Sequence, residues 1–437
     1  MKIKQVSEQL QTFIKNNFKP TKNLIHPADS HSSWSMTDNP SPEGADLNLQ
    51  RFKNNISDIP QLSDVSRDFL KLIYNEMHNA DLALSSTFNP REIAYENSNN
   101  AVLISAIPTQ IYNEFNKKCT VKKSYVFYTP KRMITVYFAF PCNNTVNDNY
   151  LRNCMKKMFM WLFIAEKFAT STCSKTMDIF IYMTDFEKKL PNDNSPIGPF
   201  HVNTAFTTPC KGSTEIHIFR REEWFKVFIH ETFHNLGLDF SSMNENISKN
   251  EIYNIFPIKS DVRLCETYCE TWAEIINLQF ITYFGTKTKN DYSKMIVKLE
   301  NMLKIEVMFS LFQSTKVLYY YGMKYSDLYD SNSISKEKRR QYREDTNVLC
   351  YYIIKSILIY NTNDFIEWTI RNNRNSLEFR KTNLNVEHYC RLIKNLYKNP
   401  SYLKNMKVIE EWFFINRNYN SFEFQNLRMT VYELEDK

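Results

Sequence analysis

The chain has 437 residues, of which 43% are hydrophobic and 15% aromatic, a composition typical of a globular protein with two or three domains and not of a disordered tail. Its net charge of +7, from 55 basic and 48 acidic residues, is modest, and the dense basic run at 336–343 is interleaved with acids, so no nucleic-acid partner is expected. The six glycines, of which Gly198 and Gly212 are the closest pair, exclude glycine-rich nucleotide-binding loops and the GxSxG elbow, because each of these needs glycines within a few residues of one another.

The cysteines and the N-terminal sequence predict an intracellular protein. The nine cysteines are odd in number and form no CxxC pair, which favours reduced thiols over a disulfide framework or a ribbon-type zinc site. The N-terminus resembles no signal peptide, and the longest apolar run, 158–165, is too short to span a membrane. We therefore expect a cytoplasmic protein without a membrane partner.

Residues 1–63 form the first predicted segment. Apolar residues at helical spacing in 1–18 predict a short amphipathic helix. The stretch 26–63 is rich in Ser, Asn, Asp and Pro, which indicates a polar linker. A domain boundary is therefore expected at residue 63.

Strands and helices alternate between residues 64 and 286, which predicts an α+β fold with a mixed sheet. The expected elements are a helix from Ser63 or Asp64, strands at 124–128 and 134–140, a long helix from Asn147 or Asn149, strands at 177–183 and 213–219, and a helix over 221–237. Beyond residue 261 the periodicity is almost entirely helical, so 287–437 is expected to be an α-helical region whose partner is unknown.

The motif that carries chemistry is His230-Glu231-Thr232-Phe233-His234, an HExxH sequence on the last of these helices. Helical residues four apart lie one turn above each other, so His230 and His234 can present two imidazoles to one metal ion. Glu231 is then positioned to accept a proton from water on that ion, and the ion implied is Zn²⁺. Two hydrogen-bonded histidines on a buried helix are the alternative.

A zinc site of this kind needs a third protein ligand. Phe240 occupies the place of the last histidine in an HExxHxxGxxH motif, and Asp239 is one residue out of phase, so we expect a carboxylate on a later helix. Three unpaired carboxylates on one face of an apolar helix repel one another, and a cation among them removes that repulsion. The candidates at successive i, i+4 positions are Glu266, Glu270 and Glu274.

An HExxH motif followed by ExxxD or ExxxE resembles the gluzincin family of zinc metallopeptidases, and ETWAE at 270–274 resembles the ExxAD form of the second motif. The resemblance implies His230, His234 and Glu270 as the metal ligands, with Glu274 steadying a metal-binding histidine from outside the ligand set. A shift of one turn makes Glu266 the ligand and Glu270 the steadying acid, and this alternative stays open. The stretch FIHETFHNLGLDF also resembles zincin-like proteins of large nucleocytoplasmic DNA viruses, which adds a host cytoplasm or a virion to the expected locations.

The resemblance implies a zinc-dependent peptidase with the sheet and active helix in an upper subdomain, over residues 64–286, and helices in a lower one. Glu231 is the implied general base, and an extended peptide or protein substrate is expected to pair with the strand at 213–219 as the edge of the sheet. The family's oxyanion donor is a Tyr or His of the helical subdomain, and the tyrosines within 319–325 are candidates without an assignment. The alternative function is a catalytically silent zincin fold that serves as a structural or binding protein.

Overall fold

The computed structural model describes residues 2–18, 56, 59–142, 147–289, 291–418 and 420–435. The predicted linker 26–63 therefore lies largely outside the described residues. The helix predicted within 1–18 is confirmed as α1 (Gln5–Asn17), which buries Leu10 and Ile14 against the rest of the protein.

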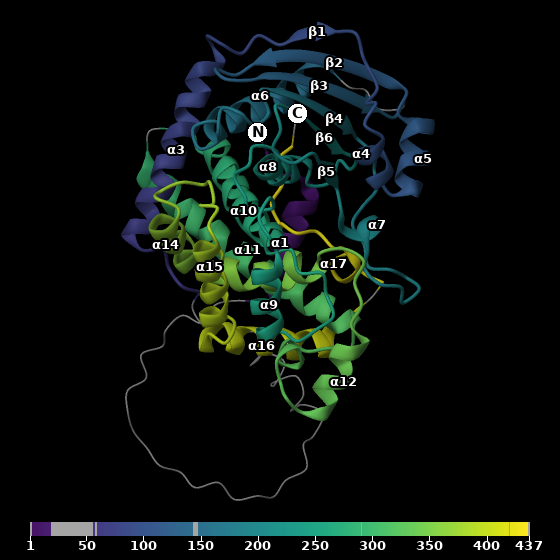
Figure 1. The fold of residues 1–437 in the computed structure, drawn as a ribbon, viewed down its shortest axis with the longest axis vertical. Helices are drawn as coiled ribbons and strands as arrows, with labels where there is room; N and C mark the ends of the chain where they lie inside the picture. The colour runs from purple at the N-terminus through teal and green to yellow at the C-terminus, as the bar shows by residue number, and fades with distance from the viewer. Residues whose placement is uncertain are drawn as a thin grey trace, which may run out of the picture.

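A six-stranded mixed sheet forms one end of the molecule (Figure 1). Its strands lie in the order β1-β2-β3-β4-β6-β5. Neighbours from β1 to β3 are antiparallel, β3, β4 and β6 are parallel, and β5 is antiparallel to β6. The bounds are β1 (Arg91–Ile93), β2 (Val121–Tyr128), β3 (Met133–Phe140), β4 (Thr176–Tyr182), β5 (Ala205–Thr207) and β6 (Ser213–Ile218).

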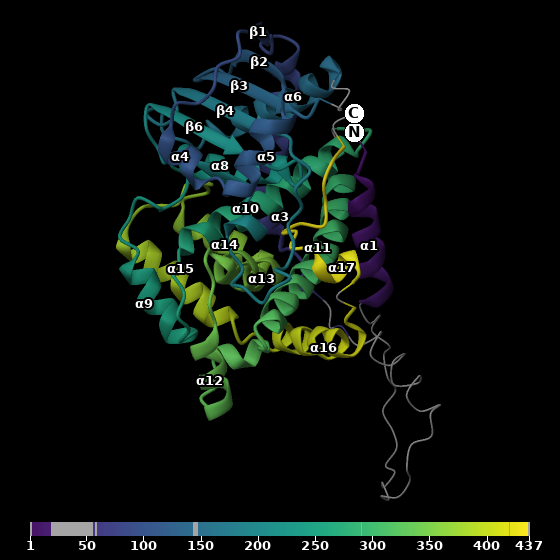
Figure 2. The ribbon, with the colours of Figure 1, turned by 90° about the vertical axis from the view of Figure 1, so that its right-hand side faces the viewer.

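The central strands read as continuous apolar runs because helices cover both faces of the sheet. On one face, α6 (Asp148–Ala165) and α8 (Trp224–Asn235) share the main hydrophobic core with alternate residues of β3 and β4, and α8 contacts β5 and β6. On the other face, α5 (Thr109–Lys118) contributes Ile111 and Phe115 to a smaller core, and Ile107, directly after α4 (Ala101–Ala106), joins them. The helix that carries the HExxH motif is thus held between the sheet and the helical part of the protein (Figure 2).

The remaining helices extend away from the sheet (Figures 1 and 2). The main core takes residues from all three predicted ranges, from Leu10 to Leu434, so the division at residues 63 and 286 stays a prediction. The bounds of the elements outside the sheet layers are α3 (Asp64–Leu84), α7 (Pro199–Val202), α9 (Asn246–Ile255), α10 (Leu264–Phe284), α11 (Tyr292–Tyr320), η1 (Tyr325–Leu328), α12 (Ser333–Gln341), η2 (Leu349–Ile354), α13 (Lys355–Tyr360), α14 (Thr362–Asn372), α15 (Asn383–Leu396), α16 (Pro400–Asn416) and α17 (Phe422–Gln425).

The mixed architecture agrees with the predicted α+β class, and the four predicted strands are confirmed as β2, β3, β4 and β6. The prediction that 213–219 forms the sheet edge is wrong, because β6 lies between β4 and β5. The edge is β5, whose three residues are too few to show a period-two pattern. The helical region predicted over 287–437 includes one π-helix, η2, which α13 continues as an α-helix.

A disulfide joins Cys173 and Cys210, so the expectation of nine reduced cysteines is wrong for this pair. The seven other cysteines form no disulfide. Within the described part of the chain, no helix combines the length and the apolar character that crossing a membrane requires.

Candidate metal centre

The HExxH motif lies in the C-terminal half of α8, a helix that is buried on almost every side. The helix begins at Trp224 and ends at Asn235. Gly237 follows it with a φ of +67°, the left-handed conformation expected after a helix C-terminus. His230 and His234, one turn apart, face α10. The helix positions both imidazoles through its own hydrogen bonding and its packing under the sheet.

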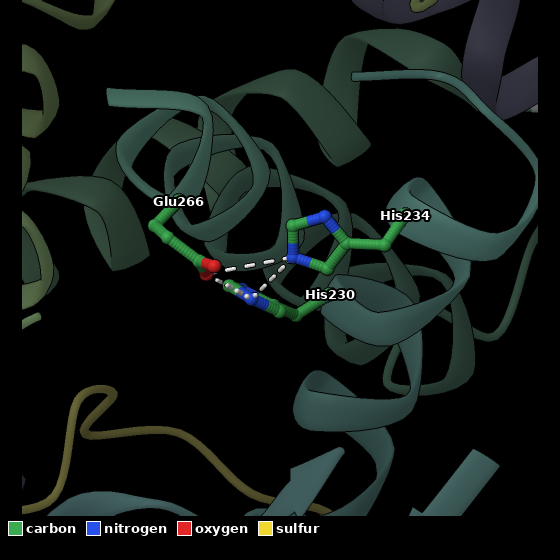
Figure 3. Close-up of side chains that lie close together, drawn as sticks. All are labelled: His230, His234 and Glu266. Carbon is green, nitrogen blue, oxygen red and sulfur yellow. Dashed lines mark hydrogen bonds and ion pairs between the residues drawn. The ribbon is translucent and has the colours of Figure 1, made fainter. Parts of the chain in front are cut away.

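Three donor atoms meet between α8 and α10 (Figure 3). The Nε2 atoms of His230 and His234 are 3.2 Å apart. Oε2 of Glu266 lies 3.1 Å from Nε2 of His230 and 3.4 Å from Nε2 of His234. The side chains of these three residues therefore converge on one point, which opens to a cleft.

Two further carboxylates fix the orientation of the imidazoles. Oε2 of Glu270 lies 3.0 Å from Nδ1 of His230, and Oδ2 of Asp239 lies 2.8 Å from Nδ1 of His234. A carboxylate accepts a hydrogen bond from the protonated ring nitrogen, so each imidazole donates through Nδ1 and keeps the lone pair of Nε2 for the point that both rings share. Cys269 also approaches Nδ1 of His234, at 3.8 Å, and thus lies on the outer side of that ring.

The cluster attracts positive charge. Burial opposes protonation of the two imidazoles, but the surrounding acidic groups outweigh it and raise the pKa of His230 and, more strongly, that of His234. Burial likewise opposes ionisation of Glu266, but the imidazoles hold the pKa of its carboxyl well below the ordinary value. A proton or a metal ion can supply the charge that these groups favour.

The donor set fits a zinc ion. Zinc bonds of about 2.0–2.1 Å at tetrahedral angles place neighbouring donor atoms roughly 3.3 Å apart. The three observed separations between donor atoms, 3.1, 3.2 and 3.4 Å, match that spacing. Two neutral imidazoles, each oriented by an outer hydrogen bond, and one carboxylate are also ligand types that Zn²⁺ prefers.

Glu270 does not lie where the first prediction expected a ligand. Its Oε2 contacts the outer nitrogen of His230, and its Oε1 pairs with the ammonium group of Lys226, which stands one turn before His230 on α8. Both charged side chains of this pair are almost fully buried. The structure therefore agrees with the one-turn shift, in which Glu266 takes the ligand position and Glu270 steadies a histidine.

Glu274 lies farther along α10 and contacts neither histidine among the described interactions. Its Oε2 is 2.6 Å from the Nζ of Lys355, and both side chains are buried. Burial raises the pKa of the Glu274 carboxyl to about 7, against the opposing effect of Lys355. Glu274 was expected to steady a metal-binding histidine. The acids that contact the outer nitrogens of the two histidines are instead Glu270 and Asp239.

The donor cluster opens to a polar cleft of about 640 Å³. Glu231 lines this cleft beside the cluster, and burial raises the pKa of its carboxyl. The edge strand β5 supplies Ala205, Phe206 and Thr207 to one wall. The general base expected from the motif and the strand that ends the sheet thus share one cavity.

Tyr351 was missed by the sequence analysis. It lies on the π-helix η2, lines the cleft, and places its hydroxyl 3.3 Å from Oε2 of Glu266, with its ring 6.1 Å from that of His230. The tyrosines considered within 319–325 lie elsewhere: for example, the hydroxyl of Tyr320 donates to the carbonyl of Ser195. A single tyrosine among 26 carries no sequence signal for such a position.

Comparison with known proteins gives one distant relative. The chain is 24% identical over 213 residues to an uncharacterized protein of Acanthamoeba polyphaga mimivirus, a match that covers 48% of this chain and 50% of the relative. The chain thus spans about half the length of the relative that it matches, and the resemblance is to a protein of viral origin. No protein-family model matches the chain, and no solved structure matches it.

Proposed function

We propose that this protein is a zinc-dependent peptidase of gluzincin type, in which His230, His234 and Glu266 hold the metal. One observation carries the proposal: three electron-pair donors lie 3.1–3.4 Å apart with their outer partners already in place. Without a cation or a proton, three such donors repel one another at that distance. A bound metal ion would remove that repulsion, and this is the simplest explanation for three donors held so close together.

The residues around the donors have the functions that peptide hydrolysis needs. A zinc ion bound by these side chains acidifies a water molecule and polarises the carbonyl of a bound peptide. Glu231 receives the proton of the attacking water and delivers it to the leaving amine. Tyr351, which also lines the cleft, can donate its hydroxyl hydrogen to the oxygen on which negative charge develops.

The edge strand supports an extended peptide as the substrate. β5 pairs with β6 on one side and, among the described strands, has no partner on the other. Unpaired backbone groups of an edge strand bind an extended chain by adding it as a further strand. Because β5 also lines the cleft, a peptide paired with it would pass beside Glu231 and the metal ligands.

The test is to measure zinc by elemental analysis of the purified full-length chain, together with hydrolysis of a mixed peptide library. We expect one zinc per chain, and we expect Glu231→Gln to keep the metal while hydrolysis falls by about 10²–10⁴-fold, the usual contribution of a general base. A wild-type protein without zinc would refute the proposal. Zinc with no hydrolysis in either protein would instead favour the catalytically silent structural or binding protein.

A further inference from the structure

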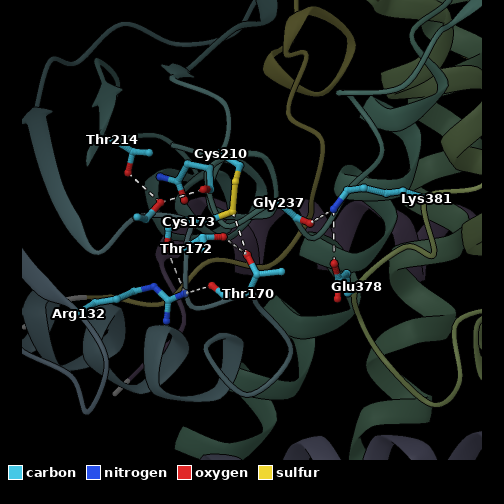
Figure 4. The surroundings of a disulfide bond; sticks show 11 residues. Arg132, Thr170, Thr172, Cys173, Cys210, Thr214, Gly237, Glu378 and Lys381 are labelled. Carbon is cyan, nitrogen blue, oxygen red and sulfur yellow. Dashed lines mark hydrogen bonds and ion pairs between the residues drawn. A yellow bond between two sulfur atoms is a disulfide. The ribbon is translucent and has the colours of Figure 1, made fainter. Parts of the chain in front are cut away.

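The disulfide Cys173–Cys210 joins two loops near Gly237, in the turn that follows α8 (Figure 4). Cys173 belongs to the connection between α6 and β4, and Cys210 belongs to the loop that joins the edge strand β5 to β6. These loops are 37 residues apart in sequence, so the covalent bond fixes the β5–β6 loop to a distant part of the chain.

The two sulfur atoms have different surroundings. Cys210 is exposed, whereas Cys173 is only 3% exposed. The hydroxyl of Thr170 donates a hydrogen bond to Sγ of Cys173 at 3.1 Å, and the guanidinium of Arg132 bonds to the carbonyl of the same residue. Thiol–disulfide exchange needs an accessible sulfur for attack and a leaving thiolate that is stabilised; the exposed residue Cys210 fits the first need, and the hydrogen bond from Thr170 to Sγ of Cys173 fits the second.

The disulfide packs against the turn that follows the metal-binding helix. A Cβ atom placed on Gly237 would lie 3.2 Å from Sγ of Cys173 and 3.3 Å from Cβ of Cys210, so the turn and the disulfide are in close contact. Gly237 follows His234 by three residues and precedes Asp239, whose carboxylate orients His234. The disulfide therefore contacts the turn between His234, a proposed ligand, and Asp239, the acid that orients it.

The same bond also bears on the wall of the cleft. Pro209, the neighbour of Cys210, lines the cleft together with Phe206 and Thr207 of β5. The next residue after Cys173 is held as well, since the hydroxyl of Ser174 donates to the carbonyl of Asn235 in α8. The disulfide thus restrains both the loop next to the edge strand β5 and the segment that bonds to the C-terminal turn of α8.

We propose that Cys173–Cys210 is a thiol–disulfide exchange site through which a dithiol reductant loosens the cleft and the metal centre. One thiolate of the dithiol attacks Sγ of Cys210; the S–S bond breaks, and its electron pair leaves on Sγ of Cys173, which then takes a proton. The second thiolate of the dithiol attacks the mixed disulfide and releases the thiolate of Cys210, which is protonated in turn. Two electrons and two protons pass to the protein, and the dithiol is oxidised to its disulfide.

The effect on metal binding rests on the proposed function, whereas the exchange itself does not. The first measurement is therefore independent of zinc: the full-length protein is treated with dithiothreitol under native conditions, and its thiols are alkylated and located by mass spectrometry. We expect Cys173 and Cys210 to become alkylated only after reduction. Hydrogen exchange over 205–212 and 236–241 should then quicken by about tenfold or more, because both segments lose their brace.

The second measurement is the zinc dissociation constant, obtained by competition with a chelator before and after reduction. We expect it to rise by about tenfold, the lower end of what disturbing an outer partner of a metal ligand costs. The double variant Cys173→Ser/Cys210→Ser should have the zinc dissociation constant of the reduced protein, and dithiothreitol should not change it. Cys119→Ser, which removes a free buried cysteine remote from the metal ligands, should respond to the reductant as the wild type does.

Either of two results would overturn the inference: a disulfide that resists dithiothreitol until the protein is unfolded, or reduction that leaves hydrogen exchange in both segments unchanged. Zinc binding that is equal in the oxidised and reduced protein would also overturn the proposed link to the metal. An oxidised protein that binds no zinc would instead refute the proposed peptidase, while the exchange measurement still decides the role of the disulfide.

Discussion

Replacing Glu266 and Glu270 in turn separates the metal ligand from the acid that orients a ligand. Glu266→Gln removes the one negative charge from the three donors, and its Oε2 is the atom that lies within 3.4 Å of both Nε2 atoms. Glu270→Gln keeps an oxygen that can accept the hydrogen bond from Nδ1 of His230. We therefore expect the zinc dissociation constant to rise by more than about 100-fold in Glu266→Gln and by about 10–100-fold in Glu270→Gln.

The two substitutions should have the opposite order of effect on stability. Glu270 is paired with Lys226, and the two side chains are 2% and 1% exposed, so loss of the carboxylate charge leaves a buried ammonium group without its partner. Such a loss costs about 3–5 kcal/mol of unfolding free energy. Within the described residues, the ion pairs of Glu266 are with the two histidines and not with a buried lysine, so we expect Glu266→Gln to destabilise the metal-free protein less.

Both effects can be measured on the same purified proteins. Chelator competition gives the zinc dissociation constants, and urea unfolding in the presence of a strong chelator gives the stability of the metal-free chains. Glu274→Gln is the matched control, because it alters the third carboxylate of α10 outside the donor cluster and should leave zinc affinity near the wild-type value. The assignment is wrong if Glu270→Gln abolishes zinc binding while Glu266→Gln binds zinc as the wild type does.

Three further substitutions test the cleft and the buried charges. Tyr351→Phe should keep its zinc and lower kcat by about 10²–10³-fold, as loss of an oxyanion donor does, and an unchanged kcat would exclude that role. Burial raises the pKa of the Glu410 carboxyl from 4.5 to about 7, so ionisation opposes folding increasingly as the pH rises from 4.5 to 7. Glu410→Gln should therefore stabilise the protein by up to about 3 kcal/mol at pH 8 and by nearly nothing below pH 4.5 in urea unfolding; a gain independent of pH would contradict this. Lys355→Met should lower the free energy of unfolding by about 3–5 kcal/mol, because the buried carboxylate of Glu274 loses its partner. Adding Glu274→Gln should restore most of that free energy in the same assay.

Much of the fold follows from local patterns. Alternating or continuous apolar residues predicted four of the six strands, and helical spacing predicted α1, α6, α8 and α10, because these elements are long enough to show their period. Strand β5 was missed because three residues show no period. The disulfide was missed because the proximity of Cys173 and Cys210 is set by how two loops pack, which no spacing in the sequence encodes.

The site was predictable to the level of the motif but not to the level of the third ligand. HExxH fixes the relative positions of His230 and His234 through helix geometry alone. Tyr351 reaches the cleft from a π-helix, and a pattern analysis that assumes 3.6 residues per turn cannot place its side chain. Asp239 was judged out of phase for metal binding, yet the turn at Gly237 brings it to the outer nitrogen of His234.

The three acids of α10 show why the ligand remained ambiguous in the sequence. Glu266, Glu270 and Glu274 share one helix face at equal spacing, so any pair of neighbours fits an ExxxE motif. The expectation that all three carboxylates are unpaired is wrong, because lysine ammonium groups pair with two of them.

Lysines from two other helices distinguish the three acids. Lys226 of α8 neutralises Glu270, and Lys355 of α13 neutralises Glu274. Among the acids of this face that the structure describes, Glu266 is the one without a lysine, and it faces two imidazole nitrogens instead. The buried charge that the lysines leave uncompensated is therefore at Glu266, and a divalent cation bound there would balance it where the HExxH motif already supplies two ligands.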